Sequence, residues 1–209
     1  GQAPLKKSLT KHNMCGIAGI AGFAASENRM ADLARMVRAL AHRGPDADGH
    51  WEDAGIALGH RRLAVLDTTD LGVQPMHSPD GRYAIVFNGE IYNFREIRAQ
   101  LSDSTFRTET DTEVILAAFA KWGPECLKQF NGMFAMAIYD RSERKLFLAR
   151  DRMGIKPIYY RIHNGVLSFA SEVRSIIAGG NFQPRLNRAV LGDFLRYQTV
   201  YAPDTLVEG

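Results

Sequence analysis

A chain of 209 residues is long enough for one domain with a substantial core, because a globular chain of this size buries roughly 70% of its unfolded surface. Its net charge of +3 is too small to indicate a nucleic-acid partner, and no apolar run reaches the roughly 18 residues of a membrane span. The two cysteines, Cys15 and Cys126, are too few for a disulfide framework, so we expect a reducing, cytoplasmic location.

The segment in front of Cys15 has the composition of an appendage. Residues 1–13 contain lysines but no apolar stretch, so they do not have the pattern of a secretory signal. We interpret residues 1–14 as a tag, a pro-segment or a misplaced start, and residues 15–209 as the functional domain.

The first predicted elements are a Gly-rich apolar strand over residues 16–23 and an amphipathic helix behind it. The helix is indicated by apolar residues that fall on one face, and Gly44-Pro45 stops it. These apolar residues are Met30, Leu33, Met36, Val37 and Leu40.

Strand signals dominate the next part of the chain. Residues 55–66 predict a pair of strands around Gly59–Arg62. Tyr83–Phe87 predicts another strand, and Asn88-Gly89 behind it is a signal for a turn.

The second half combines helices and hairpins. Asn93 predicts a helix start, and Thr110 with Glu113 has the spacing of a capping box. Asn164-Gly165 predicts a tight hairpin turn. The remaining predicted elements are strands over residues 133–139, 145–149, 158–162 and 166–169, and helices over residues 114–122, 171–178 and 188–197.

The order of these elements predicts the fold class. Strands occur in antiparallel hairpins, with helices between them and at the end of the chain. This order favours an α+β fold over a doubly wound parallel sheet. Two antiparallel sheets covered by helices would bury this many apolar strands.

Cys15 follows Met14 and leads directly into the apolar sequence GIAGI. If the methionine is removed, one residue carries both a thiol and a free α-amine. The ordinary pKa is about 8.5 for a thiol and about 7.7–8.0 for an α-amine, so the amine can be the base that activates its own thiol. The alternative is that Cys15 is a small buried residue on a strand.

Short motifs along the chain indicate a family when they are taken together. In their order they resemble the glutaminase domain of class II glutamine amidotransferases, in the asparagine synthetase branch. The motifs are MCGIAGI at 14–20, HRGPD at 42–46, GHRRLAVLD at 59–67, QPM at 74–76, FNGEIYN at 87–93, TDTEVI at 110–115, NGMFAMAIYD at 131–140, ARDRMGIKPIYY at 149–160 and FASE at 169–172. The resemblance implies the N-terminal-nucleophile hydrolase fold, a four-layer α-β-β-α sandwich of two antiparallel sheets flanked by helices.

The resemblance also implies a reaction. Cys15 would attack the side-chain amide of glutamine and release ammonia, and water would then hydrolyse the thioester to glutamate. Asn88 and Gly89 match the oxyanion hole of the family, where a side-chain amide and a backbone N–H converge on one oxygen. The alternative for this pair is a plain turn.

Three further residues match substrate-binding positions of the family. Arg62 matches the arginine that binds the α-carboxylate of glutamine, for which a planar guanidinium is suited. Asp111 matches the acid that holds the α-ammonium, although negative charge is also favourable in the first turn of a helix. Glu90 lies beside the oxyanion pair and would contribute through its backbone.

Other conspicuous residues have simpler interpretations. Arg61 is expected to be a solvated or structural charge, and Cys126 a core residue. His42, His60 and His77 are expected to be structural. Arg150–Arg152 is a charge run, interpreted as an interface or a solvated turn.

The six histidines have no metal-ligand spacing, so we expect no metal and no cofactor in this domain. The synthetase branch of the family carries a further domain that uses ATP and Mg, marked by a Ser-Gly-Gly-x-Asp-Ser loop, and no such stretch occurs here. We therefore expect a glutaminase that supplies ammonia for amide formation, with asparagine from aspartate as the default product.

Two alternatives to this function stay open. The domain could serve an acceptor other than aspartate, or it could be a non-catalytic regulatory or interaction module that kept the fold. The expected partners are glutamine and the synthetase domain of the parent protein, with a homodimer left open and neither nucleic acid nor membrane expected.

Overall fold

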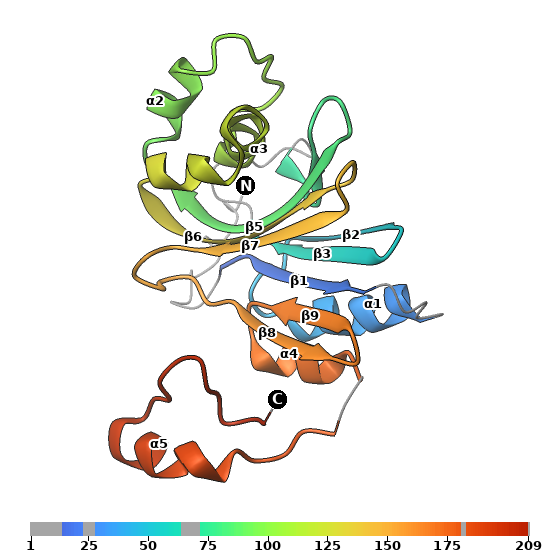
Figure 1. Ribbon diagram of the computed structural model, residues 1–209, viewed down its shortest axis with the longest axis vertical. Helices are drawn as coiled ribbons and strands as arrows, with labels where there is room; N and C mark the ends of the chain where they lie inside the picture. The colour runs from blue at the N-terminus through green and yellow to red at the C-terminus, as the bar shows by residue number, and fades with distance from the viewer. Residues whose placement is uncertain (1–13, 23–27, 64–71, 181–182, 209) are drawn as a thin grey trace, which may run out of the picture.

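The computed structural model describes residues 14–22, 28–63, 72–180 and 183–208, and these residues form two antiparallel sheets that pack face to face (Figure 1). The first sheet contains, in spatial order, β2 (Ala47–Asp53), β3 (Ile56–Arg62), β1 (Gly16–Ala21), β9 (Val166–Ala170) and β8 (Tyr159–His163). The second contains β4 (Met76–His77), β5 (Tyr83–Ile91), β6 (Gly132–Asp140) and β7 (Lys145–Arg150).

Helices cover the outer faces of both sheets, as Figure 1 shows. α1 (Arg29–Ala39) and α4 (Val173–Ala178) pack on the first sheet. α2 (Phe94–Ala99) packs on α3 (Asp111–Trp122), which covers the second sheet. The four layers are therefore α-β-β-α, and the predicted α+β class is confirmed. The other helical segments are the 3-10 helices Gly123–Gln129 and Arg188–Val190 and the helix α5 (Leu191–Tyr197).

Each pair of neighbouring layers shares a hydrophobic cluster, which explains why several strands are continuous apolar runs. Between the two sheets lie Ile17, Ile56, Leu58, Ala84, Val86, Ala135, Ala137, Tyr139 and Phe169. A second cluster joins the second sheet to α3, and a third joins the first sheet to α1 and α4. β1 and β5 are therefore buried on both faces and form the centre of the molecule.

One strand prediction is wrong, and one strand was not predicted. Residues 56–62 form one strand rather than a pair, and its partner is β2 (Ala47–Asp53). β2 was not predicted because its sequence, ADGHWED, is mostly polar and lies on the edge of the sheet. The end of the predicted pair, residues 64–66, lies outside the described residues.

Asn88 and Gly89 do not form a turn. They lie inside β5, where Asn88 pairs with Ala135 and Gly89 with Phe134 of β6. A Cβ at Gly89 would lie 2.2 Å from the carbonyl oxygen of Met133, so the glycine is needed for close approach of the two strands. Gly89 therefore reflects the packing of β5 on β6, whereas Asn164-Gly165 forms the predicted hairpin turn with φ values of 49° and 74°.

The predicted helix starts are only partly right. Thr110 caps α3, because its Oγ1 accepts a hydrogen bond from the Glu113 N–H at 3.4 Å. The Glu113 carboxylate accepts instead from the N–H groups of Arg107 and Thr108, so the capping box is incomplete. Asn93 precedes α2, but its side-chain oxygen accepts from the Asn131 N–H at 2.9 Å and does not cap the helix.

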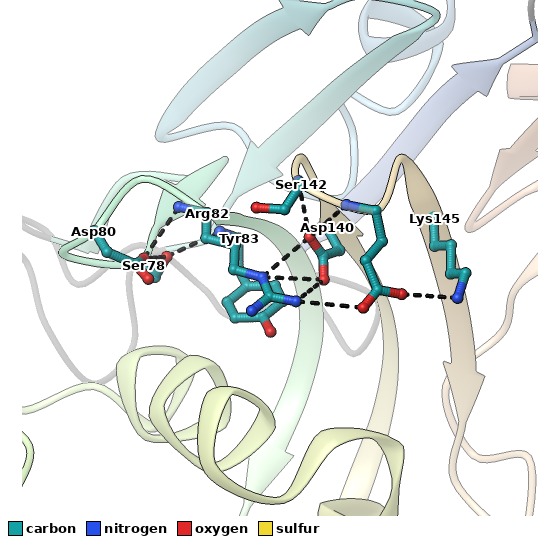
Figure 2. Close-up of polar contacts among 8 residues, drawn as sticks. Ser78, Asp80, Arg82, Tyr83, Asp140, Ser142 and Lys145 are labelled. Carbon is teal, nitrogen blue, oxygen red and sulfur yellow. Dashed lines mark hydrogen bonds and ion pairs between the residues drawn. The ribbon is translucent and has the colours of Figure 1, made fainter.

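A polar network closes the end of the second sheet where β5 begins (Figure 2). Arg82 Nη2 lies 2.7 Å from Asp140 Oδ2, and Asp140 Oδ1 also accepts from the Ser142 N–H at 2.9 Å. On the other side, Ser78 Oγ accepts from the Tyr83 N–H at 2.9 Å. These bonds tie the β4–β5 and β6–β7 connections together, and every carboxylate in Figure 2 has a partner.

Candidate functional site

A cavity of about 290 Å³ lies toward the other end of β5. It opens between the residues in front of β1, the end of β3, the middle of β5 and the first turn of α3. All six residues predicted for the site line it, namely Cys15, Arg62, Asn88, Gly89, Glu90 and Asp111. The lining residues that were not predicted for the site include Met14, His60, Gly72, Gln74, Thr112 and Lys156.

Cys15 stands directly in front of β1, and its sulfur is held between two backbone groups of one residue. The Leu63 N–H donates to Cys15 Sγ at 3.4 Å, and the thiol donates to the Leu63 carbonyl oxygen at 3.7 Å. Burial raises the pKa of this thiol, and it outweighs the lowering by the Leu63 hydrogen bond and by the charges of Arg62 and Lys156. Cys15 therefore needs a base before it can act as a nucleophile at neutral pH.

The backbone of Cys15 is anchored by Arg43, which forms an ion pair with Glu172. Arg43 Nε donates to the Cys15 carbonyl oxygen at 3.0 Å, and Arg43 Nη1 lies 3.0 Å from Glu172 Oε1. His42 Nε2 lies 2.9 Å from the same carboxylate oxygen. The motifs HRGPD and FASE, far apart in the sequence, thus meet behind Cys15 and fix its position.

Two buried nitrogens of the cavity wall have no partner among the residues that the structure describes, Asn88 Nδ2 and His60 Nε2. Burial lowers the pKa of His60 to about 3, so its ring is neutral at neutral pH. An unpaired buried polar atom costs about 1–3 kcal/mol, which favours a role for these atoms in binding. Asn88 Nδ2 is a donor and can stabilise negative charge that develops in the cavity.

Asp111 occupies the first turn of α3, and its carboxylate faces the end of β5. Its Oδ2 accepts a hydrogen bond from the Ile91 N–H at 2.9 Å. Burial raises the pKa of Asp111 to about 6, and hydrogen bonds from the Ile91 and Thr112 N–H groups oppose this only in part. At neutral pH the carboxylate is charged for most of the time, so it can hold a cation.

Arg62 supplies a buried positive charge at the end of β3, and room for its guanidinium is left by a glycine. A Cβ at Gly72 would lie 2.7 Å from Arg62 Nη2. The neighbouring Arg61 points elsewhere, with Nε donating to the Gly44 carbonyl oxygen at 3.0 Å and Nη1 lying 3.2 Å from Asp48. Arg61 therefore has the structural role expected for it, and only Arg62 reaches the cavity.

Gln74 lines the cavity, and no role was predicted for it, although it belongs to the motif QPM. Its Oε1 accepts from the Phe87 N–H at 2.6 Å, and its Nε2 donates to Thr112 Oγ1 at 3.4 Å. It therefore links β5 to α3, the two elements that carry Asn88 and Asp111.

The remaining cysteine is a core residue, as predicted. Cys126 is fully buried in the cluster between the second sheet and α3, and burial raises its pKa to about 12. Within the described part of the chain, no group of three or more His, Cys, Asp or Glu side chains could hold a metal ion. No helix in that part is long and apolar enough to cross a membrane.

The sequence matches the family model of a glutamine amidotransferase domain over residues 14–209. It is 37% identical over 198 residues to the glutamine-hydrolyzing asparagine synthetase 1 of Bacillus subtilis (strain 168), which covers 92% of this chain and 31% of that protein. It is 39% identical over 168 residues to the glutamine-hydrolyzing asparagine synthetase 2 of the same organism, with coverages of 79% and 22%. The chain thus spans less than a third of the length of these relatives.

The fold is similar to that of the glutamine phosphoribosylpyrophosphate amidotransferase from B. subtilis. The TM-score is 0.68 with 23% sequence identity, and the match covers 79% of this chain and 44% of that chain. This likeness confirms the fold expected from the motifs, the α-β-β-α sandwich of the N-terminal-nucleophile hydrolases.

Proposed function

Because this chain belongs to the glutamine amidotransferase domain family, as a class II member, we propose that it hydrolyses glutamine to glutamate and ammonia through a thioester on Cys15. The observation that carries the proposal is one cavity in which a thiol, an unpaired amide donor, a cation and a carboxylate converge. These groups belong to Cys15, Asn88, Arg62 and Asp111.

The two charged residues would orient the amino-acid end of glutamine. Arg62 would pair with the α-carboxylate, and Asp111 would hold the α-ammonium. With both charges of the substrate fixed, its side-chain amide would extend toward Cys15 and the Asn88-Gly89 segment of β5, which line the same cavity.

The chemistry requires a chain that begins at Cys15, so that the α-amine is free. The lone pair of that amine takes the thiol proton, and the sulfur attacks the amide carbon of glutamine. The electron pair of the C=O bond moves to oxygen, where Asn88 Nδ2 and the Gly89 N–H stabilise the negative charge, and Glu90 contributes through its backbone. The tetrahedral intermediate collapses, and the protonated amine gives its proton to the departing ammonia. Water then hydrolyses the thioester to glutamate and regenerates the thiol.

We extend the proposal to the parent protein on the names of the relatives alone. The ammonia would pass to a synthetase domain that uses ATP and Mg and forms an amide, with aspartate as the acceptor and asparagine as the product. No cofactor is proposed for the domain described here, and the expected location is cytoplasmic. An acceptor other than aspartate stays open.

A second candidate, a non-catalytic module, is favoured by one observation. In this chain the nitrogen of Cys15 is bonded to Met14, which itself lines the cavity. An amide nitrogen is not basic, so the thiol lacks its base as long as that bond is intact. Residues 15–209 include every helix and strand that the structure describes, so removal of residues 1–14 deletes none of them.

One experiment decides between the two candidates. The folded chain is cleaved at a protease site engineered in front of Cys15, its N-terminus is checked by mass, and glutamate release from glutamine is measured. The proposal expects turnover that the Cys15→Ala variant lacks, and labelling of Cys15 by a glutamine-like diazo-ketone. Inactive cleaved protein, or labelling chiefly at Cys126, would instead favour the non-catalytic module.

A further inference from the structure

The loop between β7 and β8 is built around one buried carboxylate. Asp151 Oδ2 accepts hydrogen bonds from the Phe134 N–H at 3.2 Å and the Lys156 N–H at 3.0 Å, and Oδ1 accepts from the Ile155 N–H at 2.9 Å. Arg150 Nε donates to the Lys156 carbonyl oxygen at 2.8 Å. Both backbone polar groups of Lys156 are therefore fixed. Of the charge run Arg150–Arg152, Arg150 and Asp151 therefore hold the loop together, whereas Arg152 is exposed in the turn as a solvated charge.

Gly154 is also required by the conformation of this loop. Its φ of +64° is in the left-handed region, and a Cβ would lie 2.9 Å from the guanidinium of Arg150. Within the motif RDRMGIKP, Arg150, Asp151 and Gly154 thus have structural roles in the loop. The backbone bonds hold the loop in place by themselves, so the side chain of Lys156 is not needed for that purpose.

The side chain of Lys156 turns into the cavity. The residue is only 6% exposed, and its Nζ lies 2.9 Å from Met14 Sδ, the side chain attached directly in front of Cys15. Among the ion pairs of the described residues, none includes Lys156. A buried ammonium without a hydrogen-bonded carboxylate costs stability, so its presence beside a reactive residue points to a function.

The charges around this ammonium come from four elements. Arg43 from the segment behind α1 and Arg62 on β3 are cations, and Glu90 on β5 and Asp151 are anions. Lys156 and Cys15 interact electrostatically with each other. Arg43 is paired with the Glu172 carboxylate, whereas Lys156 and Arg62 add positive charge beside the position in front of β1.

We propose that Lys156 is a positioning residue whose ammonium keeps the α-amine of Cys15 neutral, and therefore available as the base, in a chain that begins at Cys15. The inference rests on the proposed function, because it assigns the source of the base that the reaction needs. A cation near an amine disfavours its protonated form, and it also favours the thiolate that forms when the amine takes the proton. Lys156 would thus influence both the amine and the thiol of Cys15 without touching the substrate.

The test uses the cleaved chain and compares the pH dependence of kcat/KM in four variants. Lys156→Met and Lys156→Gln remove the charge, Lys156→Arg keeps it, and Lys145→Met removes an exposed lysine from β7 as a control for net charge. A loss of one nearby charge is expected to move the acidic limb up by about one pH unit, which is about tenfold in rate at pH 6 and little at pH 9. Lys156→Arg and Lys145→Met should keep the profile of the unaltered chain.

A second readout does not depend on turnover. In the Cys15→Ser variant, the rate of acetylation of the α-amine of residue 15 is measured against pH, with and without Lys156→Gln. The inference expects the midpoint of this labelling to rise when the lysine is removed. An unchanged midpoint, a loss of kcat/KM that is equal at all pH values, or an effect confined to KM would each overturn it. Absence of glutaminase activity in the unaltered cleaved chain would contradict the proposed function instead, and the acetylation midpoint would still decide the role of Lys156.

Discussion

Polar groups near the start of β5 have hydrogen-bond partners, whereas one polar group farther along the strand has none in the described part of the chain. At its start, beside Tyr83, the charges of Arg82 and Asp140 are paired and every carboxylate in Figure 2 accepts hydrogen bonds. Five residues further along, roughly 17 Å at the rise of a strand, Asn88 has a buried nitrogen with no partner among the described residues. Polar groups at the start of the strand are paired, and Asn88 Nδ2 is the donor that the proposed function assigns to the substrate.

The same contrast holds for the titratable groups. The hydrogen bonds from Arg82 hold the pKa of Asp140 below its ordinary value, whereas burial raises the pKa of Asp111 to about 6. A lowered carboxyl pKa stabilises the folded protein at neutral pH, and a raised one destabilises it. The cavity is therefore costly to the free protein, and a substrate with an ammonium group would relieve that cost at Asp111.

The largest expected effect tests whether the cavity that contains Cys15 is a catalytic site. The chain that begins at Gly1 should release glutamate far more slowly than the chain cleaved to Cys15, because its residue-15 nitrogen is an amide. Loss of general-base help is commonly worth about 10²–10⁴-fold. Rates are compared after both N-termini have been confirmed by mass, and equal rates would mean that the α-amine is not the base.

The next largest effect distinguishes the role of the Asn88 side chain from the role of the Arg62 charge. Asn88→Ala should lower kcat by about 10²–10³-fold, because Nδ2 would act only on the developing oxyanion. Arg62→Ala should chiefly raise KM for glutamine, because the α-carboxylate keeps its charge throughout the reaction. Steady-state kinetics of the cleaved variants measure both, and interchangeable profiles would show that these two roles are wrongly assigned.

The residues of the candidate site could be predicted from the sequence, because each of them was assigned by its position in a motif of the family. All six predicted site residues line the cavity. What local patterns could not predict was the setting of Asn88-Gly89, because the same dipeptide that marks a turn also permits close packing of β5 on β6. Lys156 was missed for a similar reason, since its place depends on Asp151 and on a cavity formed by distant segments.

The third effect depends on the raised pKa of Asp111. Below about pH 6 the carboxylate is increasingly protonated and can no longer pair with the α-ammonium of glutamine. KM for glutamine should therefore rise by up to about tenfold for each pH unit below 6. Asp111→Asn should have a high KM without this slope. Kinetics from pH 4.5 to pH 8 measure it, and a KM that is flat across that range would contradict the role of Asp111.

The smallest effect on activity is expected from Asp140, which pairs with Arg82 at the start of β5. This variant tests whether the two parts of β5 are independent. Asp140→Asn removes a charge that Arg82 and two backbone N–H groups contact, so the free energy of unfolding should fall by about 1–2 kcal/mol at pH 7. Urea unfolding measures this loss, and Asp103→Asn, at an exposed position, is the matched control for charge.

The sign of the pH dependence follows from the lowered pKa of Asp140. Its contribution is present above the unfolded pKa of about 3.9 and is lost as the pH falls through the lower folded value, so the difference between the parent and Asp140→Asn should shrink in acid. The kinetics of glutamate release at pH 7 should not change in this variant, because the network is remote from the cavity. If Asp140→Asn altered KM or kcat as strongly as Asn88→Ala does, the two ends of β5 would be coupled, and the separation of stability from function along this strand would not hold.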